Sequence, residues 1–432
     1  MKKRMDFKSK FIRAGVVSSI LSLMVLALLY FYWNDGPTYG YGNQIAKWIS
    51  IIKELNVERE PVEEVVPVNV SYDRTTVPYY TPDDEFLGMV DMTDRNKLNS
   101  FLKMLKERDE YRYILCDINF SDPQLRSEYD EELFSTIASM RDIVVASSNL
   151  ETDPEAIRGK TALSEYVRRT VGDDFLKYDF MKDGNPSIAL KMWQELDGGT
   201  YEESWWGACM NGKLCLKTLI PDFKYVIYGD VYAKDNSMSI QNMGKTLQYY
   251  QRVPGYARAY DDKIVLLGSW KNDDIHNTIA GLQPGVVVIY NAYLALKNMD
   301  NHVSVWLYIL IFIVIWLEMM LIFRNSYMPQ LLVILKQRLE SVKNDKKNEC
   351  KIWKRWLCWC EKEYVQFKEF KDEHDKIWEF LSWPLGLINY GTPLAVLVIL
   401  AYLMDGVFVN VIIVGLFLGI VSKFQEKFKF VS

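Results

Sequence analysis

Five acidic or imidazole side chains follow segments that we expect to form strands, where the edge of a sheet can offer a binding crevice. They are Asp73, Asp117, Asp122, Asp274 and His276. Groups of these types coordinate cations or hydrogen-bond polar ligands. The alternative is structural, because the aspartates of a D-x-x-x-S-D-P sequence, here Asp117 and Asp122, commonly cap turns. We favour the structural alternative and keep the five residues as candidate ligand-binding residues.

A catalytic site would need more than these side chains. Hydrolysis requires a nucleophile beside a base, or a metal triad. The chain has three histidines, and only His276 and His302 lie in the large acidic block between the first two apolar runs. We recognise no nucleophile–base pair, so we predict that the protein is not an enzyme and has no cofactor.

Two cysteines, Cys209 and Cys215, flank the dipeptide Asn211-Gly212. Asn-Gly favours a tight hairpin turn, which would bring the two sulfur atoms together. We expect a disulfide if this part of the chain lies in an oxidising compartment, and two reduced thiols are the alternative. Cys116 lies within an apolar segment, and we expect it to be a packed core residue.

A second group of metal-ligand types, Cys350, Cys358, Cys360 and His374, has the spacing C-x7-C-x-C-x13-H. Zinc sites use paired C-x2-4-C knuckles, so we predict no metal here. Apolar residues at alternating steps of four and three instead predict a long helix with a heptad seam. The seam would contact the protein's own chain, a partner or the membrane surface. Its candidate contact residues are Trp353, Leu357, Tyr364, Phe367 and Trp378.

Four apolar runs are long enough to be considered as membrane spans. The first is uncharged and ends in aromatic residues, which favours an uncleaved anchor over a signal peptide. The second contains one charged residue, Glu318. The last two flank Asp405-Gly406 and predict a helical hairpin, although the final run is short enough to be re-entrant. The predicted spans are residues 14–33, 303–323, 384–403 and 407–422.

Charge is distributed unequally between the segments that these spans separate. Residues 34–302 hold 29 Lys/Arg and 42 Asp/Glu, a net −13, whereas the rest of the chain is +8. Basic residues concentrate at 1–13, in 324–383 and at 423–432. The positive-inside rule therefore places these three segments in the cytoplasm and residues 34–302 outside. An acidic outer domain predicts no nucleic-acid partner, while the basic inner segments favour contact with anionic lipid.

Residues 34–302 alternate between short Val/Ile-rich runs and amphipathic stretches. This pattern predicts an α/β domain with a mainly parallel sheet and helices on both faces. Asp94 is the expected N-cap of its helix. The expected strands are 65–72, 111–118, 143–147, 224–228 and 263–268, and the expected helices are 94–108, 130–140 and 186–196.

Several of these segments carry a resemblance to one family. The blocks VPVNVSYD, LCDINFSDP, DEELFSTIASMRDIVVAS, PSIALKMWQEL, KIVLLGSW and DDIHNTIAGLQPGVVVIYNAYLAL resemble the CHASE type 2 domain. That resemblance implies an extracytoplasmic sensory module of a bacterial membrane receptor, with one span before the domain and three after it. The chain departs from the family in two ways. We expect no attached effector domain, because only ten residues follow Ser422, and about sixty residues separate the second and third spans.

We therefore expect a multi-pass inner-membrane receptor or receptor subunit with both termini in the cytoplasm. It would sense an unknown extracytoplasmic ligand and pass the signal to a separate membrane or cytoplasmic protein, and it could form a homo-oligomer. The alternative is an accessory subunit of an envelope complex that uses the outer domain for docking.

Overall fold

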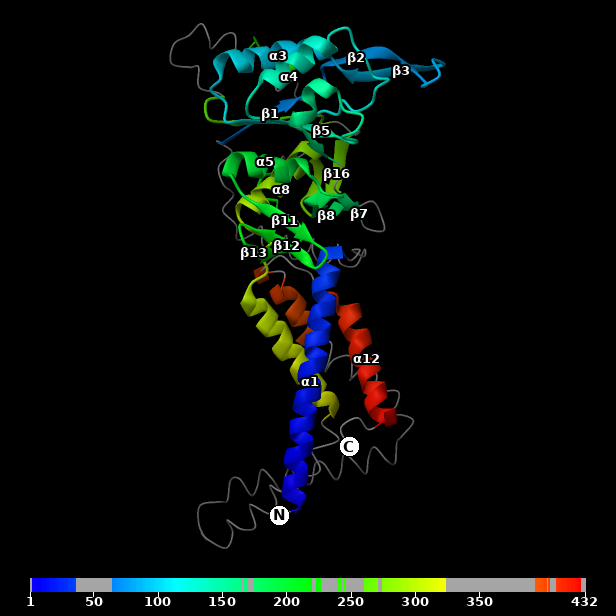
Figure 1. The fold of residues 1–432 in the computed structure, drawn as a ribbon, viewed down its shortest axis with the longest axis vertical. Helices are drawn as coiled ribbons and strands as arrows, with labels where there is room; N and C mark the ends of the chain where they lie inside the picture. Colours follow the sequence, from blue (N-terminus) through cyan, green and yellow to red (C-terminus); the bar gives the residue numbers. More distant parts are fainter. Residues whose placement is uncertain are drawn as a thin grey trace. The chain divides into compact units, whose positions relative to one another are not determined.

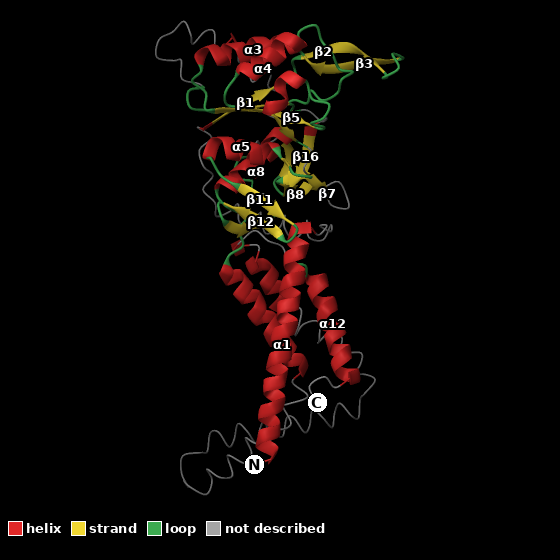
Figure 2. Cartoon of the chain, in the orientation of Figure 1, coloured by secondary structure: helices red, strands yellow, loops and turns green. Residues whose placement is uncertain are grey.

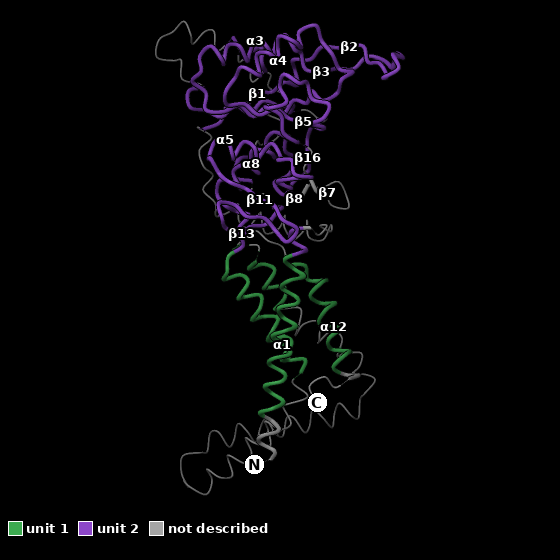
Figure 3. The backbone as a smooth tube through the Cα atoms, in the orientation of Figure 1, with its two compact units in different colours: residues 1–30, 304–404, 409–432 green, residues 31–303, 405–408 purple. Residues whose placement is uncertain are grey.

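The computed structural model divides the chain into two compact units (Figure 3). One contains residues 1–30, 304–404 and 409–432, and the other contains residues 31–303 and 405–408. We call the second the α/β unit. The structure describes residues 2–35, 64–164, 167–169, 175–219, 223–226, 239–242, 244–245, 260–270, 274–323, 393–401, 403–404 and 409–428.

A five-stranded sheet with the order β1-β15-β4-β5-β6 forms the centre of the α/β unit (Figure 2). Every neighbouring pair in it is parallel. The strands are short apolar runs that suit a sheet buried on both faces. Their bounds are β1 Val65–Asn69, β4 Tyr113–Asp117, β5 Ile143–Ser147, β6 Thr161–Leu163 and β15 Ile264–Gly268.

Helices cover both faces of this sheet (Figure 1). Helices α3 (Arg95–Arg108) and α4 (Asp130–Ser139) pack with one set of strand side chains, including Ile114 and Cys116. Helices α5 (Ile188–Asp197) and α8 (Gly285–Lys297) pack with the alternate set, including Tyr113 and Leu115. Successive side chains of a strand point to opposite faces, so each strand contributes to both cores.

The helix starts follow local sequence signals. Asp94 accepts a hydrogen bond from the backbone N–H of Lys97 and caps α3, which confirms the predicted N-cap. Ser187 caps α5 in the same way by accepting from Leu190 N–H. Each contact satisfies one of the backbone donors that a helix start leaves without an intrahelical partner.

The predicted strand at 224–228 is wrong in its described part, because residues 224–226 belong to no strand.

Small antiparallel sheets accompany the central sheet. The antiparallel elements are β2 Arg74–Tyr80 with β3 Phe86–Thr93, β9 Met181–Lys182 with β10 Asn185–Pro186, β11 Tyr201–Ser204 with β12 Gly207–Met210 and β13 Lys213–Cys215, β14 Thr218–Leu219 with β8 Phe175–Asp179 and β7 Val167–Arg169, and β16 Ile275–Thr278 with β17 Gly281–Pro284.

Two of the described helical segments are long and apolar enough to cross a membrane, judged by length and composition alone. They are Lys8–Asn34, within α1 (Lys2–Asp35), and Val305–Phe323. Helix α12 (Val411–Phe428) contains a shorter apolar stretch, and residues 393–401 are also helical. Four crossings therefore stay a prediction.

Candidate functional site

A cavity of about 580 Å³ lies at the carboxyl ends of the central parallel strands. In open parallel sheets this edge is where ligands bind. The charged residues of its lining come from the end of β4, the starts of β2 and α3, strand β3, and β16 with the residue before it. The polar and charged lining residues are Arg74, Asp91, Thr93, Arg95, Asp117, Asn119, Ser164, Tyr178, Ser269, Asp274 and His276.

Three of the five residues proposed from the sequence meet in this cavity, namely Asp117, Asp274 and His276. Asp117 ends β4, and Asp274 and His276 lie at and within the start of β16. His276 Nε2 lies 3.5 Å from Asp274 Oδ1. A Cβ atom built on Gly285 would lie 2.5 Å from Asp274 Oδ1 and 2.9 Å from Asp117 Oδ2, so both carboxyl groups approach the first residue of α8.

The two carboxyl groups influence each other's ionisation. Removal from bulk water, followed by repulsion from Asp274, raises the pKa of Asp117 well above its ordinary value. The start of α8 favours negative charge, but this effect does not offset the burial of the acid. A cationic group placed between the two acids would relieve the repulsion.

Arg95 supplies the opposite charge, and its position was missed from the sequence. Its side chain is 3% exposed, and Nη1 and Nε have no hydrogen-bond partner within the described residues. Asp130 Oδ1 lies 3.6 Å from Nε, and the guanidinium lies 4.2 Å from the centroid of the Phe120 ring. Burial lowers the pKa of Arg95 to about 10, which leaves the group positively charged at neutral pH. A buried cation with unused donors is costly and is suited to an anionic partner.

A short hydroxyl network positions a second cavity arginine, Arg74. Its Nη2 donates to Ser269 Oγ at 3.4 Å. The hydroxyl groups of Ser269 and Ser71 are 3.0 Å apart, and Ser71 Oγ accepts from the N–H of Trp270 at 2.8 Å. The network joins the residues after β1 to those after β15, so Arg74 is fixed by the same strand ends that form the cavity.

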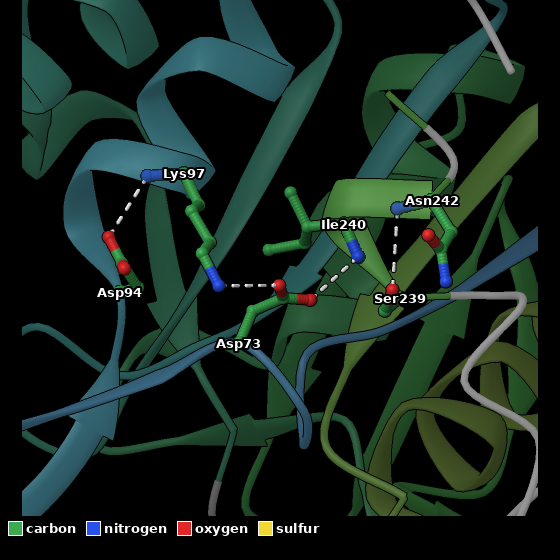
Figure 4. A network of polar contacts seen from close by, with 6 residues as sticks. All are labelled: Asp73, Asp94, Lys97, Ser239, Ile240 and Asn242. Carbon is green, nitrogen blue, oxygen red and sulfur yellow. Dashed lines mark hydrogen bonds and ion pairs between the residues drawn. The ribbon is translucent and has the colours of Figure 1, made fainter. Parts of the chain in front are cut away.

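Asp73 does not line the cavity. Its polar contacts connect neighbouring segments of the fold (Figure 4). One carboxylate oxygen lies 3.2 Å from Lys97 Nζ, and the other accepts from the N–H of Ile240 at 2.8 Å. Its own carbonyl oxygen accepts from the N–H of Asp94, the cap of α3. The side chain is 2% exposed and holds three separate segments together.

Asp122 also has a structural role, as the D-x-x-x-S-D-P alternative predicted. Its carboxylate accepts from the N–H of Gln124 at 2.9 Å and from the hydroxyl of Tyr79 at 3.2 Å. These contacts form a turn and attach it to β2. Asp122 does not belong to the cavity lining.

The predicted disulfide is absent, although the predicted turn is present. Asn211 and Gly212 both have positive φ and connect β12 to β13. Their two-residue turn pairs Ala208 with Cys215 and Cys209 with Leu214, so the two cysteines point to opposite faces of the hairpin. Both are free thiols, and Cys116 is a buried free thiol in the core, as expected.

The helix-seam residues Trp353, Leu357, Tyr364, Phe367 and Trp378 lie outside the described residues, as do Cys350, Cys358, Cys360 and His374. Within the part of the chain that the structure describes, no group of three or more His, Cys, Asp or Glu side chains could hold a metal ion.

Strand β8 connects the cavity to the carboxyl end of α1. Tyr178 lines the cavity, and its neighbour Lys177 donates from Nζ to the carbonyl oxygens of Trp33 at 2.8 Å and Tyr32 at 3.3 Å. Lys177 is 5% exposed, and a cation at a helix carboxyl end is favourably placed. Thr218 in the paired strand β14 also donates to Trp33 O, at 2.8 Å.

The residues from Leu214 to Thr218 hold both ends of the α/β unit's chain. Lys217 N–H donates to the side-chain oxygen of Asn34 at 2.8 Å. Leu216 N–H donates to Asn301 O at 2.9 Å, and His302 Nδ1 lies 2.9 Å from Leu214 O. One short segment therefore contacts the last turn of the first long apolar helix and the residues that precede the second.

Comparison with known proteins finds no match: no family model, no curated protein and no solved structure is similar to this chain.

Proposed function

We propose that the chain is a membrane-anchored receptor or receptor subunit whose α/β unit binds a small extracytoplasmic ligand. The observation that carries this proposal is the position of β8. Within this strand, Tyr178 lines the charged cavity while the adjacent Lys177 binds the end of α1. A ligand that preferred one position of β8 would therefore act directly on the last turn of a long apolar helix.

The cavity supports the ligand-binding half of the proposal. Its volume of about 580 Å³ falls within the range of small-molecule sites. Its walls hold a buried arginine with unused donors and an acid whose charge is disfavoured. Such groups are typical of functional sites because an optimally stable fold would pair or exclude them.

The proposal that the protein is anchored in a membrane rests on the sequence pattern and on the two long apolar helices. The acidic α/β unit would face outward, and the basic segments 1–13, 324–383 and 423–432 would face the cytoplasm. In this arrangement the chain crosses four times, and the 324–383 segment passes the signal to a separate protein. A ligand shifts such a system only by binding its two states with different affinity.

Cysteine labelling in spheroplasts tests the topology. Asp83 is exposed in the turn between β2 and β3, and Asp83→Cys should react with a membrane-impermeant maleimide while the membrane is intact. The native Cys350, Cys358 and Cys360 should react only after permeabilisation. Labelling of the inner cysteines in intact spheroplasts would overturn the proposed orientation.

A fluorescence experiment tests the coupling without any ligand. Phe31, at the end of α1, stacks on Trp205 with ring centroids 6.5 Å apart. A bimane fluorophore attached to Phe31→Cys, with the native cysteines replaced by alanine, should be quenched by Trp205. The full chain in lipid nanodiscs is the sample, and Trp205→Phe gives the signal without quencher.

Charge changes in the cavity should alter this quenching if the cavity and α1 are coupled. The informative variants are Asp274→Asn and Arg95→Met, and Glu131→Gln on the exposed side of α4 is the charge-matched control. Altered quenching in both cavity variants and none in the control supports the receptor. Unchanged quenching in all three removes its main support and favours the accessory, docking role.

A further inference from the structure

Two sets of opposite charge face the same cavity from different elements of the fold. Arg95 and Arg74 come from the start of α3 and the start of β2. Asp117 and Asp274 come from the end of β4 and the residue before β16. A third acid, Asp91 of β3, also lines the cavity and accepts a hydrogen bond from the Thr76 hydroxyl. The sets have separate partners: Arg74 is bound to Ser269, and Asp274 is beside His276.

The arginine side can bind an anion in addition to Asp130. Nη1 of Arg95 is buried without a hydrogen-bond partner within the described residues, and its contact with Asp130 at 3.6 Å is made through Nε. A guanidinium presents donors in a planar fork that matches a carboxylate. A bound carboxylate would use the donor that the fold leaves without a partner.

The acidic side favours a positively charged group. Asp117 and Asp274 both approach Gly285, and repulsion between them contributes to the raised pKa of Asp117. The described residues offer no set of three metal ligands. An ammonium group can satisfy two carboxylates with three directed donors and needs no coordination shell.

We propose that the cavity binds a small zwitterion of the amino-acid class, a free amino acid or a short peptide. Its carboxylate pairs with Arg95, and its ammonium group lies between Asp117 and Asp274. This inference rests on the proposed receptor function and names the ligand class for the same cavity. A cavity of about 580 Å³ has room for a short peptide or for an amino acid with accompanying water.

A single charge does not explain the site equally well. A simple anion would bring no cation to the acids of the cavity, and a simple amine would leave Nη1 of Arg95 without a hydrogen-bond partner within the described residues. A ligand with both charges satisfies both sides within a single molecule.

The test uses the full chain in lipid nanodiscs and measures its thermal unfolding. The probes are an equimolar mixture of the twenty L-amino acids and a mixture of dipeptides, each at millimolar concentration. Propionate and propylamine are the matched compounds with one charge. A ligand that binds only the folded state raises the unfolding temperature with its concentration. We expect a rise with at least one zwitterion mixture and none with either compound of single charge.

Substitutions in the cavity then test which residue binds the carboxylate of the ligand and which binds its ammonium group. Once the active component is identified, Arg95→Met and Asp274→Asn should each weaken its affinity by about 10- to 100-fold, as expected for loss of a charged hydrogen bond. Arg95→Lys should lose less because it keeps the charge. Glu131→Gln should bind as the unmodified protein does.

Each other outcome contradicts the proposal. No stabilisation by either mixture excludes the zwitterion class, and stabilisation by propionate or propylamine alone assigns a ligand of single charge. Retained affinity in either cavity variant places the site elsewhere. The bimane experiment requires no ligand, so the zwitterion inference can fail while the cavity–helix coupling stands.

Discussion

Lys177 donates a hydrogen bond to the carbonyl oxygen of Trp33 at 2.8 Å, so a strand of the α/β unit binds the carboxyl end of α1 directly. The lysine also lies 5.5 Å from the centroid of the Tyr32 ring. A buried ammonium group is stable here because helix-end carbonyl oxygens accept its hydrogen bonds.

Replacing Lys177 with methionine should release the end of α1. We expect a loss of about 1–3 kcal/mol of stability, because charged hydrogen bonds are lost from a buried position. Amide hydrogen exchange at residues 32–35 should become faster. Lys191→Met is the control, because Lys191 also donates to main-chain carbonyl oxygens, those of Gly159 and Thr161. Equal exchange at residues 32–35 in both variants would show that Lys177 does not hold the helix.

The stability of the protein should depend on the ionisation of Asp117. The pKa of Asp117 is raised in the folded state. The stability that Asp117 contributes to the fold is therefore fully present below the pKa of the unfolded chain, and it is lost as the pH rises through the pKa of the folded protein. Asp117→Asn stays neutral and should be more stable than the unmodified protein at pH 8, by about 1–3 kcal/mol.

The measurement for Asp117 is thermal unfolding from pH 4 to pH 8. The advantage of the variant should shrink toward pH 4, because the Asp117 carboxyl of the unfolded chain becomes increasingly protonated as the pH approaches its ordinary pKa of 3.8. Asp91, Asp274, His276, Arg74 and Arg95 line the same cavity and are present in both proteins, so the difference between the two curves reports on Asp117. A difference that does not change with pH would contradict the raised pKa.

A methyl group at Gly285 should disturb both carboxyl groups. The added Cβ would lie 2.5 Å from Asp274 Oδ1 and 2.9 Å from Asp117 Oδ2, so the acids must move. We expect Gly285→Ala to lose about 1–3 kcal/mol of stability, as overpacked sites do. Gly159→Ala is the control, since a Cβ there meets no atom within 4 Å. Equal unfolding temperatures would mean that the two acids do not approach α8 as described.

Cys209 and Cys215 should both accept alkyl groups without prior reduction. Burial is the main cause that raises the pKa of Cys215 to about 12, so its thiolate is rare and its reaction should be the slower one in the folded protein. After unfolding without reductant, mass spectrometry of the peptides should find both cysteines alkylated. An unmodified, cross-linked peptide pair would show that the hairpin register is wrong.

Asp73→Ala should destabilise the fold without affecting the cavity. The change leaves the N–H of Ile240 without its acceptor and removes the partner of Lys97, at an expected cost of about 2–4 kcal/mol. Affinity for any zwitterion that the thermal-unfolding test identifies should be unchanged in the folded fraction. A loss of affinity as large as that of Asp274→Asn would move Asp73 from the structural residues to the site.

Local signals in the sequence were sufficient for four of the five strands of the central sheet, and the short edge strand β6 was missed. Strand β5 has its predicted bounds, Ile143–Ser147, and Asp94 caps α3, because buried apolar runs and capping residues act over a few neighbouring positions. The hairpin of β2 and β3 was missed, since most of its side chains are exposed or half-buried and no clear apolar face marks it.

The cavity was only partly predictable, because it depends on contacts between segments that are distant in the sequence. The acids were found because they follow strands, but the approach of Asp117 to Asp274 depends on two segments separated by more than 150 positions. Arg95 carries no local sign of burial, because an arginine in the first turn of a helix is usually solvated. Its unused donors appear only once Phe120 and Asp130 surround it.

The segment from Leu214 to Thr218 restricts how the α/β unit can move its two chain connections. Asn34 and Asn301 are both bound to it, through Lys217 and Leu216. Sliding one connection past the other would break these hydrogen bonds, whereas a joint tilt or rotation keeps them. We therefore expect the segment from Leu214 to Thr218 and both chain connections to move together as one rigid group.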